Sequence, residues 1–156
     1  MQGDIENKKV ADLGTGTAIL AIGAAKLEAQ VTAVEKEKKA LKSGKKNAEK
    51  LNADIKFIEV DVEDFTGDFD TVLMNPPFSV HSEIGLTFWE KALKISNTIY
   101  GISPRGARDD IKNLVRKSKH KLEGVQEYNI GLPPSYGFHT EQNRETPVDL
   151  IITKRR

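Results

Sequence analysis

The chain has 156 residues, of which 38% are hydrophobic and 30% are charged, enough for a single soluble domain that spans residues 1–156. Its 24 basic and 23 acidic residues give a net charge of +1, so any binding to nucleic acid has to come from local patches. No apolar run approaches the ~20 residues of a membrane span and no secretory signal is visible, so a cytoplasmic location is expected. Without cysteines, and with only 3 scattered histidines, the sequence predicts neither a disulfide nor a metal site. His81 and His120 are expected on the surface.

Segments typical of strands and of helices alternate along the chain. Short apolar or alternating runs predict strands at residues 10–13, 30–34, 55–60, 71–74, 98–102, 121–131 and 148–153. Helical patterns are found at residues 18–27, 36–51, 83–95 and 107–117. In the first of these helices, Ile19, Ile22 and Ala25 are expected along one side.

This alternation predicts an α/β fold: a doubly wound, Rossmann-like, mostly parallel sheet of seven strands with helices on both faces. Ligands then bind at the carboxyl ends of the strands. The last two strands follow each other without a helix, so an antiparallel C-terminal hairpin is expected at one edge of the sheet.

A turn with two glycines follows the first predicted strand, in the sequence Asp12-Leu13-Gly14-Thr15-Gly16. Glycines allow a sharp turn and a close approach of ligand to backbone, and the next helix offers free N–H groups. A nicotinamide fingerprint would place a third glycine where Ile19 stands, which weakens that interpretation. The position after the first strand favours a cofactor site over an ordinary tight turn.

Acidic residues end the second and third predicted strands. Glu35 lies 21 residues after Gly14, where a carboxylate can accept hydrogen bonds from both hydroxyls of a ribose. The alternative is that Glu35 is one of several charges facing solvent. Asp61 could accept from an adenine amino group while Val62 packs on the ring; as an alternative, Asp61 only caps a turn.

The fourth predicted strand ends in Asn75-Pro76-Pro77-Phe78. Each proline fixes its own φ and restricts the residue before it, so the loop is stiff. The Asn75 side-chain oxygen and the Pro76 carbonyl can accept both N–H groups of a planar amino group, and this localises the nitrogen lone pair. The Asn amide takes no proton in water, so the loop acts by positioning and electrostatic complementarity. Phe78 would stack on a target ring that is single-stranded or flipped out.

Two further groups are candidates for binding a substrate. Arg105 and Arg108 follow the fifth strand, on the side where a nucleic acid would lie, and are expected to contact phosphates. Tyr136, Phe138 and His139 form either a stacking platform or a hydrophobic plug for their own loop.

At these motifs the chain resembles class I S-adenosylmethionine-dependent methyltransferases that modify adenine N6. The segment 132–139, Leu-Pro-Pro-Ser-Tyr-Gly-Phe-His, together with the Asn75 loop, narrows the resemblance to one family. This is the methyltransferase-like family that makes N6-methyladenosine in small-subunit ribosomal RNA, in its archaeal form. The resemblance implies this reaction on RNA, with S-adenosyl-L-methionine as cofactor.

The resemblance also implies site residues and a partner. The cofactor-binding residues are expected to be Asp12, Gly14, Thr15, Gly16, Glu35, Asp61, Val62 and Asn75. The catalytic loop would be Asn75, Pro76, Pro77 and Phe78. Family members pair with a small zinc-binding activator protein, which is expected to dock near residues 55–60, since an uncovered apolar edge strand is a pairing site.

Other functions stay open at this point. A protein glutamine N5 methyltransferase also acts on a conjugated amino group, but usually carries Tyr where Phe78 stands. A DNA adenine methyltransferase normally adds a target-recognition domain. A noncatalytic binding module is the third alternative.

The sequence departs in places from the family pattern. Ser79 stands after Phe78, where the family usually has Gly. The sequence also begins just before the first predicted strand, where family members carry a helical segment, so a shortened or divergent member of the family is expected.

Overall fold

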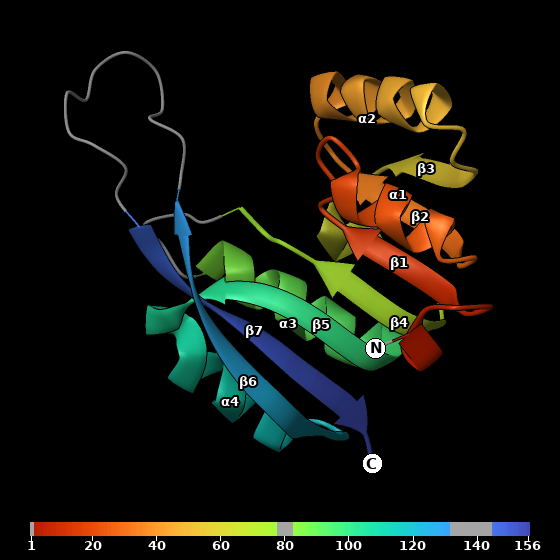
Figure 1. The fold of residues 1–156 in the computed structure, drawn as a ribbon. Helices are drawn as coiled ribbons and strands as arrows, with labels where there is room; N and C mark the ends of the chain where they lie inside the picture. Colours follow the sequence, from red (N-terminus) through yellow and green to blue (C-terminus); the bar gives the residue numbers. More distant parts are fainter. Residues whose placement is uncertain (1, 78–82, 132–144) are drawn as a thin grey trace, which may run out of the picture.

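The computed structural model describes residues 2–77, 83–131 and 145–156, and its centre is a seven-stranded sheet (Figure 1). The strands lie in the order β3-β2-β1-β4-β5-β7-β6. They are β1 (Lys9–Leu13), β2 (Gln30–Glu35), β3 (Ile55–Glu59), β4 (Phe69–Met74), β5 (Ser96–Pro104), β6 (His120–Gly131) and β7 (Glu145–Arg155). The first five strands pair in parallel, and β7 is antiparallel to both of its neighbours. The predicted α/β fold and the antiparallel hairpin are thereby confirmed.

Helices cover both faces of this sheet (Figure 1). They are α1 (Ile19–Lys26), α2 (Lys38–Lys50), α3 (Glu83–Ile95) and α4 (Arg108–Lys117), with short 3-10 turns η1 (Gln2–Asp4), η2 (Val62–Asp64) and η3 (Arg105–Ala107). Trp89 of α3 and Ile111 of α4 are fully buried in one core. Ala21 and Ile22 of α1 belong to the second core, on the other face. Among the described residues, no helix is long and apolar enough to cross a membrane.

The start of the first helix differs from the prediction. Ala18 adopts a left-handed conformation, with φ of 70°, and the helix begins only at Ile19. The buried face consequently consists of Ala21, Ile22 and Ala24, while Ile19 is 74% exposed. Ile19 therefore does not share the environment of Ile22, although both were expected along one side of the helix, because the turn before the helix sets its rotation.

His120 was expected on the surface and is instead fully buried at the start of β6. Its Nδ1 lies 3.1 Å from Thr153 Oγ1 of β7 and its Nε2 lies 3.0 Å from the Ser96 carbonyl. Burial lowers the pKa of the His120 imidazole. The residue joins β6 and β7 to the start of β5, a contact that depends on the strand order.

The strand order also fixes the place of the site. β1 has β2 on one side and β4 on the other. The chain therefore continues from β1 through β2 and β3 on one side, and then crosses to β4 on the other side. In open α/β sheets, ligands bind outside the carboxyl ends of the strands at such a point. Leu13 and Met74, the last residues of β1 and β4, are paired in the register, so the loops that follow them leave the sheet side by side.

Candidate active site

A cavity of about 510 Å³ opens at the carboxyl ends of β1, β2, β3 and β4. Its walls come from the glycine turn, the segment after β2, the segment after β3, the Asn75 loop and α3. The lining residues are Gly14, Gly16, Val34, Glu35, Lys36, Glu37, Val60, Asp61, Val62, Glu63, Asn75, Pro77, Ile84, Thr87 and Phe88. The structure therefore brings most of the predicted cofactor-binding residues together in one cavity, along with Pro77 of the predicted catalytic loop.

The glycine turn requires glycine at its first position. Gly14 has φ of +69°, and a Cβ added there would lie 2.8 Å from a ring atom of Phe88. Gly16 has φ of +55° with open space around it. The Phe88 ring thus forms the floor under a bare stretch of backbone, and a ligand can approach that backbone closely.

Asp12 and Thr15 lie behind the turn and do not line the cavity. Asp12 is 1% exposed, and its Oδ2 accepts hydrogen bonds from Thr15 Oγ1 at 2.6 Å and from the Ala21 N–H at 3.1 Å. One carboxylate thus ties β1 to the turn and to the first turn of α1. The contribution of Asp12 and Thr15 to cofactor binding is therefore expected to be indirect, because these residues hold the glycine turn in its conformation.

Glu35 bridges two neighbouring backbone segments at the cavity wall. Its Oε1 accepts from the Gly16 N–H at 2.9 Å and its Oε2 from the Glu37 N–H at 3.0 Å. A carboxylate has about four lone-pair positions, so two remain for hydroxyl donors of a ligand. This geometry excludes the alternative in which Glu35 only faces solvent.

Asp61 and Val62 form the wall after β3. Asp61 Oδ1 accepts from the Glu63 N–H at 2.9 Å and so caps the short turn η2. The capping role considered for Asp61 is confirmed, and its second oxygen forms no hydrogen bond with the described residues. Val62 is buried and offers an apolar surface to the cavity.

The Asn75 loop forms the opposite wall. Asn75 and Pro77 are exposed and line the cavity, whereas Pro76 is buried beneath them. The Asn75 amide forms no hydrogen bond with any described residue, so its oxygen is available as an acceptor. Phe78 and the residues Tyr136, Phe138 and His139 lie outside the described residues.

Arg105 and Arg108 do not reach the cavity, because both bind a buried carboxylate. Arg108 donates to both oxygens of Asp149, each at 2.6 Å, and to Glu127 at 2.7 Å. Arg105 lies 3.4 Å from Asp149 and donates to the Tyr128 carbonyl. The Arg108 guanidinium holds the pKa of the Asp149 carboxyl below its ordinary value. A phosphate contact by these arginines stays a prediction.

The comparisons with known proteins agree with this geometry. The family model of the methyltransferase small domain matches residues 1–99. The chain belongs to this family. It is 34% identical over 157 residues to the rRNA N(6)-adenosine-methyltransferase METTL5 of Danio rerio, covering 95% of this chain and 76% of that protein. A protein of Methanocaldococcus jannaschii named as a protein N5-glutamine methyltransferase is 40% identical over 82 residues, 51% of this chain and 42% of its own length.

A solved structure of this methyltransferase fold is also similar along nearly the whole chain. It is the crystal structure of a Pyrococcus horikoshii protein described as an RNA methyltransferase. The TM-score is 0.87 at 31% identity, and the match covers 98% of this chain and 77% of the other.

Sequence reasoning missed the contribution of α3 to the methyltransferase site. Ile84, Thr87 and Phe88 of α3 line the cavity, and none of them was among the predicted site residues. The available signal was that α3 follows the Asn75 loop after a short connection, so its first turns have to start near the carboxyl end of β4. Lys36, Glu37 and Glu63 were missed because they sit just past the strand ends.

Asp12 predicts a pH dependence of stability. Burial raises the pKa of its carboxyl from an ordinary value of 3.8 to about 7. The folded state then holds a proton that the unfolded chain releases, so the free energy of unfolding should fall as pH rises from about 4 to about 7. Chemical denaturation of the parent and of Asp12→Asn across this range measures it. The variant should lack this decline, and parallel profiles for the two proteins would contradict the assignment.

Proposed function

We propose that the chain transfers the methyl group of S-adenosyl-L-methionine to the N6 amino group of an adenosine in RNA, with small-subunit ribosomal RNA as substrate and the cytoplasm as its location. The observation that carries the proposal is that Asn75 lines the same cavity as Gly16 and Glu35. An acceptor for an amino group and a site suited to a nucleoside cofactor therefore share one cavity. The identity to METTL5 over most of both chains supports the RNA substrate.

The residues of the cavity fit the proposed cofactor. The two free lone-pair positions of Glu35 suit the ribose hydroxyls, and the free Asp61 oxygen together with buried Val62 suits an adenine ring. The bare backbone at Gly14 and Gly16 lets the rest of the molecule lie against the turn. When bound, this cofactor supplies a methyl group on a positively charged sulfur.

Asn75 positions the amino group that receives the methyl. Its side-chain oxygen accepts one N–H and the Pro76 carbonyl accepts the other, which directs the nitrogen lone pair into the cavity. As the bond from this nitrogen to the methyl carbon forms, the bond from sulfur to carbon breaks and the sulfur becomes neutral. The nitrogen then loses one proton to water, so the loop has to supply no base. Phe78 is proposed to stack on the target ring.

A glutamine side chain is the second candidate acceptor, because it too carries a conjugated amino group. The 40% identity to the glutamine methyltransferase supports this candidate. That match covers only about half of the chain, however, whereas the match to METTL5 covers 95%. The RNA substrate is therefore favoured.

Labelled S-adenosylmethionine tests the proposal directly. The protein would be incubated with its activator and unmodified small-subunit ribosomal RNA, and in parallel with a glutamine-containing peptide from a peptide-chain release factor. The label is expected in N6-methyladenosine after digestion of the RNA. Label in the peptide alone would contradict the RNA substrate and support glutamine methylation instead. The Asn75→Ala protein serves as the negative control in both reactions.

Glu35 gives a measurable prediction for cofactor affinity. Replacing Glu35 by Ala should weaken binding of S-adenosylmethionine by about 1–3 kcal/mol, because two charge-assisted hydrogen bonds to the ribose are lost. Calorimetric titration measures the change. Glu49→Ala, which removes an exposed carboxylate from α2, is the matched control and should bind as the parent does. Equal affinities for all three proteins would remove Glu35 from the site.

We also infer that β3 is the docking edge for a small zinc-binding activator protein. β3 is the terminal strand of the sheet, and Phe57 and Ile58 are only partly buried. Such an edge offers unpaired backbone groups to a strand of a partner. Hydrogen exchange with and without the activator tests it. Amides of residues 55–60 should exchange more slowly in the complex, and protection at β6, the opposite edge, would contradict this docking site.

A further inference from the structure

Helix α2 concentrates positive charge in a nearly neutral chain. Its 13 residues contain six lysines and one glutamate, whereas the whole chain has a net charge of only +1. The remainder of the chain is therefore net negative. The lysines are Lys38, Lys39, Lys42, Lys45, Lys46 and Lys50, and they are called the lysine face below.

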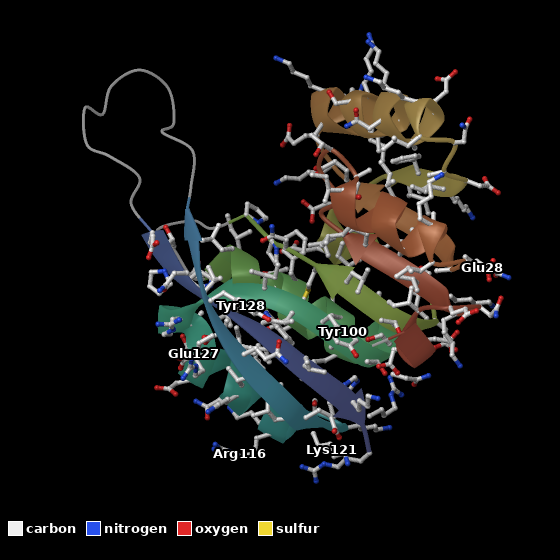
Figure 2. The ribbon with its side chains drawn as sticks, in the orientation of Figure 1. Glu28, Tyr100, Arg116, Lys121, Glu127 and Tyr128 are labelled. Atoms are coloured by element: carbon white, nitrogen blue, oxygen red, sulfur yellow. The ribbon has the colours of Figure 1, made fainter. Side chains whose placement is uncertain are left out.

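The lysine face is a single exposed surface. All six lysines are exposed, and at 100° per residue they fall within an arc of about 140°. The buried residues Leu41, Gly44 and Ala48 lie on the opposite side of the helix. Figure 2 shows several side chains with nitrogen tips that stand away from the body of the molecule along α2. In the part of the chain that the structure describes, none of these lysines forms an ion pair.

The helix is fixed to the glycine turn of the active site. A Cβ added at Gly44 would lie 3.0 Å from the Gly16 carbonyl oxygen, so the two backbones are in close contact. The Asn47 side-chain amide donates to the Thr17 carbonyl at 3.0 Å. Lys36 and Glu37, which line the cavity, directly precede the helix. The lysine face thus begins at the rim of the cavity and extends for about 20 Å along the molecule.

We propose that the lysine face binds the sugar–phosphate backbone of the RNA that flanks the target nucleotide. This inference rests on the proposed function, since it assumes that an RNA substrate enters the cavity. A row of unpaired ammonium groups suits phosphates, which position a nucleic acid without reading its sequence. The negative remainder of the chain repels the same polyanion, so the RNA is steered toward α2.

A charge-neutralising variant tests the lysine face. The variant would combine Lys42→Gln, Lys45→Gln and Lys46→Gln. Glutamine removes the charge, but it is also a long polar side chain and has a helix propensity similar to that of lysine. The matched control combines Arg116→Gln, Lys117→Gln and Lys119→Gln, three exposed positive charges in and after α4. Figure 2 labels Arg116 at the opposite end of the view from α2. Affinity for a small-subunit ribosomal RNA fragment would be measured by fluorescence anisotropy between 50 and 200 mM salt, a range over which phosphate contacts have large effects.

The α2 variant is expected to bind the RNA about ten-fold or more weakly at the lower salt concentration. The slope of log affinity against log salt concentration should be smaller in magnitude by about 2, since each lost phosphate contact removes ~0.7. The control should bind like the parent. Unchanged affinity of the α2 variant, or an equal loss in both variants, would overturn the inference. Titration with S-adenosylmethionine verifies that the α2 variant is folded, since its cofactor affinity should equal that of the parent.

The outcome separates this inference from the proposed function. If the parent methylates the RNA and the α2 variant binds it equally well, the lysine face is not the RNA surface and the proposed function stands. If the parent binds the RNA through the lysine face but transfers no label to adenosine, the proposed reaction is wrong and the RNA surface stands.

Discussion

Replacing Asn75 by Ala should lower methyl transfer to adenosine at least about 100-fold while S-adenosylmethionine still binds. The amide oxygen is the only acceptor that this side chain offers to the target amino group, and loss of one preorganised hydrogen-bonding group at a reacting centre has effects of this size. Its side chain forms no hydrogen bond with the described residues, so its removal should leave the fold intact. Single-turnover rates and calorimetric titration measure the two quantities.

The control for this variant is Asn113→Ala, which truncates an exposed amide on α4. It should react at the rate of the parent. An Asn75→Ala protein that turns over normally would exclude the amide mechanism. A variant that loses cofactor binding as well would show that Asn75 acts in the cofactor half of the cavity.

Gly14→Ala should both destabilise the protein and abolish tight binding of S-adenosylmethionine. A left-handed conformation at a residue with a Cβ costs about 1–2 kcal/mol. The new Cβ would also lie 2.8 Å from the Phe88 ring, which is buried and cannot move freely. Urea denaturation gives the loss of stability, and calorimetric titration gives the loss of affinity.

Two further variants isolate the cause. Gly23→Ala, in the exposed middle of α1 with nothing near its Cβ, should instead raise the free energy of unfolding by about 0.5–1 kcal/mol. Combining Gly14→Ala with Phe88→Leu should recover part of the lost stability, because the smaller side chain relieves the overlap. Equal effects of Ala at Gly14 and Gly23 would mean that the turn tolerates a side chain.

The sequence was sufficient to predict the elements and the edge that carries the site. Each predicted strand and helix is present, because the apolar periods of 2.0 and 3.6 residues are local properties. Glu35 and Asn75 line one cavity, since each ends a strand and parallel strands end at one edge.

The sequence did not show contacts that depend on strand order. Arg105 and Arg108 bind Asp149, which is buried next to them because β7 lies between β5 and β6, while their contact with phosphates stays a prediction. His120 is buried for the same reason. Asp12 was assigned to the cofactor from its position in the motif; the structure shows that its side chain lies behind the turn, and its effect on cofactor binding stays a prediction. Local patterns do not determine which strand is inserted between two others.

The insertion of β7 imposes an order of assembly on the nascent protein. Among the described strands, β6 pairs with β7 alone, so it has no place in the sheet until the later segment 145–155 has been synthesised and has added to β5. During translation, β6 leaves the ribosome as an unpaired strand of 12 residues, exposed to misassociation and to chaperones. The cofactor half of the sheet, β1 to β4, has no such dependence and can form first. A nascent chain would thus gain its cofactor-binding edge before the other half of the sheet closes.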